Sequence, residues 1–131
     1  MSGTANPSPT IRILHACDIR SAKLGEAGSQ RVLLGGPGDD ASPLLMGITV
    51  VRPDHTSALI EHDSAEICYV LSGVGSMITD RSEHAFQPGD AIVIEQGCWH
   101  GIRAERDPVE MLYVFPTPLA PVTREHRGAA Q

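Results

Sequence analysis

Short apolar runs separated by turn residues are the feature that most restricts how this chain can fold. Each run is rich in Val, Ile or Leu and is bounded by Gly, Pro or Asp. β-branched residues favour strands, and closely spaced turn signals are typical of sandwiches and barrels. The sequence therefore predicts an all-β domain, a jelly roll or short barrel, with strands at residues 11–14, 31–34, 44–51, 58–62, 67–71, 76–79, 84–86, 91–95, 99–103 and 111–115.

One helix and two terminal segments complete the predicted organisation. A short helix is expected at residues 18–25, where Asp18 would cap the first turn. The Ser- and Pro-rich residues 1–10 lack the basic and apolar regions of a secretory signal and are expected to form a flexible leader. A single domain is expected at residues 11–116. A Pro-rich tail at residues 117–131 should run over the surface.

Charge and composition exclude several classes of partner. The formal net charge is -6, whereas a nucleic-acid-binding domain needs a basic surface to neutralise phosphates. No apolar run approaches the ~18 residues of a membrane-spanning helix. The three cysteines are odd in number and widely spaced, so they form neither a disulfide framework nor a zinc pair. We expect a cytoplasmic protein that binds neither nucleic acid nor membranes.

Two segments place metal-binding side chains at the ends of predicted strands. His62 and Glu66 precede the strand at residues 67–71, and His100 follows the strand at residues 91–95. Neutral imidazole and carboxylate are ligands for Zn, Fe, Ni or Mn. A single histidine at a strand end is more often a surface residue than a ligand, so the inference depends on the spacing of both segments together.

That spacing resembles the paired motifs of the cupin superfamily. The first motif contains two histidines, a glutamate and a glycine, and its later half is matched by His62, Glu66 and Gly73. The second motif ends in a glycine and a histidine, and it is matched by Gly89, Gly97 and His100. The resemblance extends over roughly residues 40–116. It implies the cupin jelly roll, a double-stranded β-helix barrel, in agreement with the strand pattern.

The sequence departs from the cupin motifs at two positions. Ile60 stands where the first histidine would be, and Glu95 replaces a proline. Because alternate residues of a strand share a face, Ile60 should add an apolar wall beside His62. The remaining set implied by the resemblance is His62, Glu66 and His100, which would hold a divalent transition metal (Fe, Zn, Ni or Mn). His55 is either a fourth ligand or a solvated turn residue.

The same alternation suggests which other residues line a pocket. Cys68 shares a face with Glu66, either as a pocket residue or as a small buried filler, and Tyr113 on the last strand could donate a proton. The expected pocket residues are Ile60, Cys68 and Tyr113, and the candidate catalytic residues are Glu66 and Tyr113. Such a pocket suits a small, partly hydrophobic organic substrate.

A closer resemblance concerns the small cupins of aromatic polyketide pathways. It rests on residues 31–34, 66–73 and 113–121 and implies a metal-assisted, aldol-type cyclase. Two alternatives stay open: a non-haem iron dioxygenase or isomerase, and a non-catalytic small-molecule-binding cupin with a degenerate metal site. Ile60 favours the non-catalytic alternative, and the three retained ligands favour an enzyme. The resemblance also implies a homodimer in which residues 11–14 of each copy extend a sheet of the other.

Overall fold

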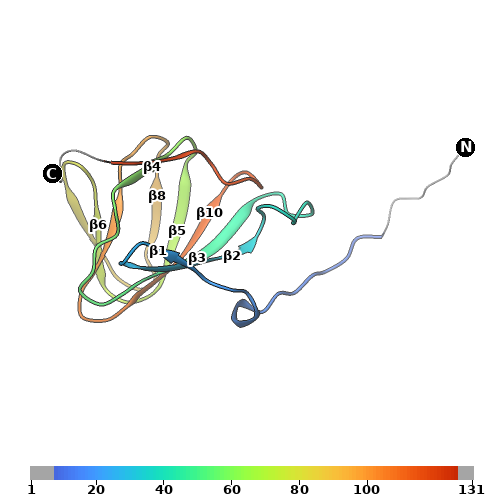
Figure 1. The fold of residues 1–131 in the computed structure, drawn as a ribbon, viewed down its shortest axis with the longest axis horizontal. Helices are drawn as coiled ribbons and strands as arrows, with labels where there is room; N and C mark the ends of the chain where they lie inside the picture. The colour runs from blue at the N-terminus through green and yellow to red at the C-terminus, as the bar shows by residue number, and fades with distance from the viewer. Residues whose placement is uncertain (1–7, 127–131) are drawn as a thin grey trace, which may run out of the picture.

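The computed structural model describes residues 8–126, and nearly all of their regular structure is β-strand. The larger sheet is antiparallel, and its strands lie side by side in the order β1 (Ala22–Leu24), β2 (Gly28–Leu34), β3 (Leu45–Val51), β10 (Val109–Phe115), β5 (Glu66–Ser72) and β8 (Ala91–Ile94). Figure 1 shows β8, β5, β10, β3 and β2 in succession across the molecule. The predicted all-β architecture is confirmed.

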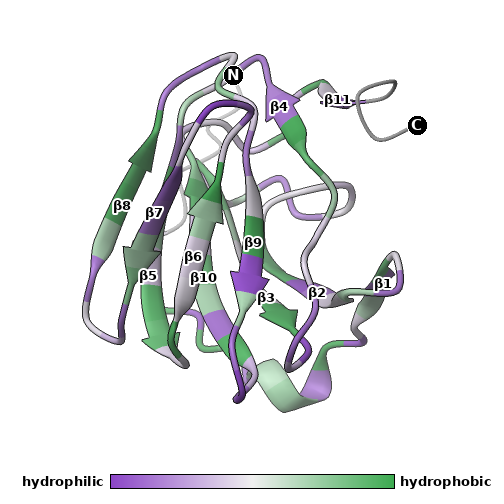
Figure 2. Ribbon diagram, turned by 90° about the vertical axis from the view of Figure 1, so that its left-hand side faces the viewer, coloured by the Kyte–Doolittle hydropathy of each residue, from purple (hydrophilic) through white to green (hydrophobic). Residues whose placement is uncertain are grey.

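Two smaller sheets complete the jelly roll (Figure 2). One contains β7 (Glu83–Phe86), β6 (Gly75–Ile78) and β9 (Gly101–Ala104) in that order, and the other pairs β4 (Ile60–His62) with β11 (Thr123–Glu125). Strands that are far apart in the sequence pair within the sheets. In the larger sheet β3 pairs with β10, and in the smallest sheet β4 pairs with β11. This topology brings the two ligand-bearing segments of the sequence to the same end of the barrel.

Strand alternation separates the core from the surface. On β10 the residues at alternate positions are buried, from Val109 through Met111 and Tyr113 to Phe115. On β5 the buried positions are Glu66, Cys68 and Val70. A fully buried Val or Met side chain contributes about 1.5–3 kcal/mol relative to an exposed one, so these strands stabilise the barrel while presenting Glu66 to its interior.

Two of the predicted elements are wrong. Residues 11–14 form no strand, and Ile11 and Ile13 are 90% and 76% exposed. Their alternation is a strand pattern, but no strand within residues 8–126 pairs with the segment, which extends away from the barrel in Figure 1. The helix expected at residues 18–25 is replaced by a 3-10 turn at Ala16–Asp18 and by β1, which forms a hairpin with β2.

The tail contains a strand that the sequence did not predict. Residues 116–121 lack regular structure, as expected, but Thr123–Glu125 pairs with β4 in register with His62, Glu61 and Ile60. The Val122 N–H also donates to the Asp63 carboxylate. The tail therefore contributes a wall of the barrel. Parts of the predicted leader and tail, residues 1–7 and 127–131, lie outside the described residues.

The outer face of the larger sheet carries exposed apolar side chains. Ile67, Tyr69 and Val93 are 53%, 45% and 70% exposed on the neighbouring strands β5 and β8. Within residues 8–126 no helix is long and apolar enough to span a bilayer.

Candidate metal centre

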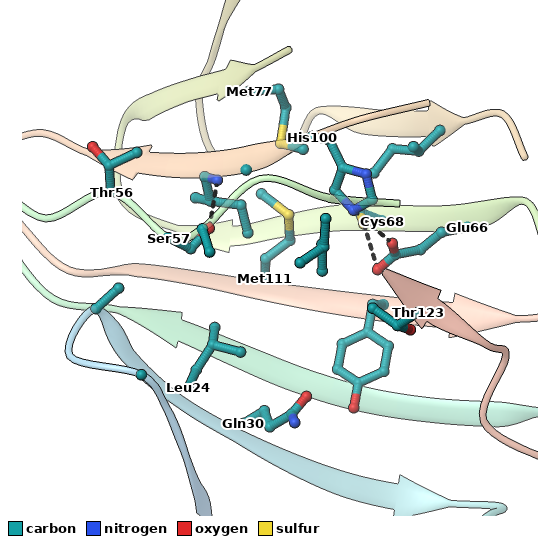
Figure 3. Close-up of a pocket in the computed structure, with 18 of the residues that line it drawn as sticks. Leu24, Gln30, Thr56, Ser57, Glu66, Cys68, Met77, His100, Met111 and Thr123 are labelled. Carbon is teal, nitrogen blue, oxygen red and sulfur yellow. Dashed lines mark hydrogen bonds and ion pairs between the residues drawn. The ribbon is translucent and has the colours of Figure 1, made fainter. Parts of the chain in front are cut away.

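Three buried side chains from separate segments of the chain meet at one end of the barrel. The Oε1 atom of Glu66 lies 3.2 Å from His62 Nε2 and 3.3 Å from His100 Nε2. One ligand atom from each residue falls within 4.8 Å of the others. All three residues are less than 9% exposed. The structure thus brings together the three residues that the sequence proposed as ligands, and Figure 3 shows Glu66 facing His100.

The backbone fixes the two histidines relative to each other. His62 ends β4, and His100 precedes β9. An isolated bridge joins the backbones of Ile60 and His100 with N–H···O distances of 2.9 and 2.8 Å. The N–H of Gly97, a residue with φ of 82°, donates to the carbonyl of His62 at 2.9 Å. Because that conformation favours glycine, the motif glycine is explained by the turn that places His100 beside His62.

Each imidazole is oriented through its outer nitrogen. His100 Nδ1 lies 2.9 Å from the Cys98 carbonyl oxygen, which can only accept, so Nδ1 carries the hydrogen. His62 Nδ1 lies 2.7 Å from Thr123 Oγ1, and that hydroxyl is itself placed to donate to the Pro121 carbonyl at 3.3 Å. Both rings therefore hold their hydrogen on Nδ1 and turn a lone pair on Nε2 towards Glu66.

The chemistry of the three side chains fits a cation held between them. Glu66 Oε1 is buried with no hydrogen-bond donor among the described residues, and two Nε2 lone pairs face it. A negatively charged oxygen beside two lone pairs is unfavourable unless a proton or a metal ion lies between them. The donor set, two imidazole nitrogens and one carboxylate, is the one used by non-haem iron and by some zinc sites. The three residues therefore fit a divalent transition metal.

Without a metal, a proton takes part of that role. Burial alone would raise the pKa of Glu66, but when such a proton lies between the rings and the carboxylate, hydrogen bonding with His100 and His62 outweighs burial and lowers the pKa to about 2. Burial likewise disfavours a charged His100, yet its contact with Glu66 leaves the pKa of His100 above its usual value. Glu66 thus stays an anion over the physiological range, as a metal ligand must.

The triad opens into an apolar cavity of about 500 Å³ inside the barrel (Figure 3). Ile60, Cys68 and Tyr113 line it, where strand alternation placed them. The remaining wall includes the thioethers of Met77 and Met111. Burial raises the pKa of the Cys68 thiol, and its Sγ lies 3.6 Å from Glu66 Oε2. Cys68 is therefore a neutral neighbour of the triad.

Tyr113 does not point at the triad. A Cβ added at Gly47 would lie 2.3 Å from the Tyr113 hydroxyl oxygen, so the ring lies over β3. Glu66 is on β5, which is on the opposite side of β10 from β3. Burial and the charge of Glu66 raise the pKa of Tyr113 to about 12. Tyr113 thus directs a neutral phenol towards β3 and away from the triad.

His55 lines the same cavity but does not join the ligand cluster. Its Nδ1 lies 2.8 Å from the Pro53 carbonyl, and no ligand atom of His55 falls within the group formed by the triad. Thr123 is the contact that sequence reasoning missed. It lies outside both cupin motifs, in a segment with no apolar pattern, so no sequence signal indicated that its hydroxyl would orient His62.

Comparisons with known proteins agree with this geometry. The model of the cupin domain matches residues 47–115. Among solved structures, the polyketide cyclase RemF from Streptomyces resistomycificus is 22% identical, with a TM-score of 0.76 over 91% of this chain and 87% of that one. A cupin-2 domain protein from Rhodospirillum rubrum is 20% identical, with a TM-score of 0.74 over 93% and 84% of the two chains.

An oxalate decarboxylase from Lactobacillus farciminis is 23% identical, with a TM-score of 0.73 over 85% of this chain and 34% of that one. Comparison with curated proteins finds no match. At these identities the solved structures show a common fold and not a common reaction. The matched domain model covers more than half of the sequence, and the barrel has the expected strands, so the chain belongs to the cupin family.

Proposed function

We propose that this protein is a metal-dependent enzyme that acts on a small organic biosynthetic intermediate, and that it catalyses an aldol-type ring closure. The observation that carries the proposal is the convergence of two imidazoles and one carboxylate on an apolar cavity. The reaction class is taken from RemF, a polyketide cyclase that shares this fold.

A divalent transition metal bound by His62, Glu66 and His100 would supply Lewis acidity that polarises a carbonyl oxygen of the substrate. The chain contributes the rest. The acceptors at Cys98 and Thr123 hold the two rings in the ligating orientation. Ile60 cannot coordinate, so the protein supplies three ligands and leaves the remaining positions to water or substrate.

Tyr113 is the proposed proton shuttle. In an aldol-type closure, the carbon next to one carbonyl forms a bond to the carbon of a second carbonyl. The first carbon loses a proton and the oxygen of the second carbonyl gains one, so atoms balance without an oxidant. A neutral phenol directed away from the triad is suited to donate to that second oxygen and to recover the proton from the carbon through water.

Metal loading tests the proposal directly. Protein purified without chelator, or loaded with Fe(II), Zn(II), Ni(II) or Mn(II), should hold about one equivalent per chain. We expect His100→Ala to abolish loading while it retains a cooperative thermal transition. His84→Ala, at an exposed position, is the matched control. Absence of loading with all four metals would contradict an enzyme of this kind and favour the non-catalytic binding alternative.

Iron selectivity would indicate the second candidate, a dioxygenase. The same two histidines and one carboxylate form the facial set of non-haem Fe(II) oxygenases. Substrate-dependent consumption of O₂ by the iron-loaded protein distinguishes it from a cyclase, whose ring closure needs no oxygen.

A further inference from the structure

Apart from its histidines, the cavity has no basic side chain among the described residues. Among residues 8–126, no arginine or lysine lines it, whereas the carboxylates of Glu26, Glu66 and Glu125 do. Glu26 and Glu125 are also exposed, so they lie where the cavity reaches solvent. Sites that bind carboxylates or phosphates normally supply an Arg or Lys to pair with the anion.

Strand alternation turns the nearest arginines away from the cavity. On β11, Thr123 and Glu125 line the cavity, while Arg124 between them pairs with Glu61 at 2.7 Å. On β9, Ile102 lines the cavity, while the next residue, Arg103, pairs with Glu83. The exclusion of cations therefore holds on strands from two different sheets.

On strand β2, too, an arginine lies next to a residue that lines the cavity, and here the lining residue is neutral. Gln30 lines the cavity and the adjacent Arg31 does not. Figure 3 shows the Gln30 amide on the wall away from His100. The polar groups of that wall, an amide and the neutral phenol of Tyr113, donate or accept hydrogen bonds but carry no charge. The rest of the wall is mostly apolar.

We infer that the cavity selects an uncharged, largely apolar molecule, which reaches the triad through carbonyl or phenol oxygens and places neutral polar groups against Gln30 and Tyr113. This inference deepens the proposed function and rests on it. A second carboxylate on the substrate, away from the metal, would be buried without a counter-ion and would pass the carboxylates at the opening. Acidic substrates are therefore disfavoured.

A matched pair of probes tests the inference. Benzohydroxamate and 4-carboxybenzohydroxamate share one chelating group and differ by one remote negative charge, and 4-carbamoylbenzohydroxamate controls for size. When titrated into Zn(II)-loaded protein, benzohydroxamate and 4-carbamoylbenzohydroxamate should each bind at least about tenfold more tightly than 4-carboxybenzohydroxamate. Gln30→Arg should close that gap by improving binding of the carboxylate, whereas Ser29→Arg, one residue away and outside the cavity, should preserve it.

The outcomes separate the two proposals. Equal affinities for the three probes, or failure of all three to bind metal-loaded protein, would overturn the inference while leaving metal binding intact. If no metal loads, the proposed function fails, and the same probes titrated into metal-free protein still report the charge preference. If 4-carboxybenzohydroxamate binds metal-free protein as tightly as 4-carbamoylbenzohydroxamate does, the inference is overturned. Glu125→Gln is the second variant. It removes a carboxylate at the opening of the cavity without adding a larger side chain, so it should reduce the difference in affinity between the carboxylate probe and the uncharged probes.

Discussion

The hydroxyl of Thr123 should set the affinity of the metal site although it is not a ligand. Thr123→Val keeps the shape of the side chain but removes the acceptor for His62 Nδ1–H, which lies 2.7 Å away. Losing a hydrogen bond of this kind costs about 1 to 2 kcal/mol, because the ring N–H is left unpaired or must recruit water. Thr123 is exposed, so water can compensate in part. We therefore expect metal affinity to fall by about five- to thirtyfold.

Competition with a chromophoric chelator for Zn(II) or Co(II) measures this change. Thr123→Ser retains the hydroxyl and should bind metal nearly as well as the unmodified chain. Arg124→Ala removes the neighbouring ion pair to Glu61 on the same strand pair and should change affinity less than Thr123→Val. An affinity for Thr123→Val within twofold of the unmodified chain, or an equal loss in Thr123→Ser, would refute the orienting role of the hydroxyl.

Three further predictions concern pH, packing and thiol reactivity. In metal-free protein, the raised pKa of His100 adds stability that is full below pH ~6.5 and is lost as pH rises through the folded-state pKa. The lowered pKa of Glu66 adds stability that is lost as pH falls from ~4.5 towards 2. The melting temperature should therefore decline above pH ~6.5, and the increase in melting temperature on adding Zn(II) should grow over that range. Gly47→Ala should lower the free energy of unfolding by about 1–3 kcal/mol and displace Tyr113, because the new methyl group would overlap its ring; an unchanged denaturant midpoint would contradict this contact. In native protein, a thiol reagent should modify the two exposed cysteines rapidly and the buried Cys68 only on unfolding; rapid reaction of all three would show that the cavity is open to the reagent.

The triad was predictable because its residues fall in two segments that resemble the paired cupin motifs. Strand alternation alone places Glu66 and Cys68 on one face, and the turn at Gly97 fixes the approach of His100. The motif spacing then joins the two segments. These two segments were sufficient to expect that the three side chains would meet. In the structure their ligand atoms lie within 4.8 Å of one another.

The wrong predictions concern features that depend on a partner segment. Alternation at residues 11–14 indicates a strand but cannot indicate that a sheet edge is available, and in the described part of the chain no strand pairs with this segment. The strand at Thr123–Glu125 has almost no apolar pattern and exists because β4 offers it an edge.

The position of Thr123 has a consequence for comparing relatives of this protein. The cupin-domain match ends at residue 115, so the residue that steers one imidazole lies outside the region by which members of the family are identified. Two relatives with identical triads could thus differ in metal selectivity through their terminal extensions alone. A chain shortened to residues 47–115 would keep His62, Glu66 and His100 but would lose the Thr123 hydroxyl that orients His62. Surveys that align only the shared barrel would leave that difference unseen.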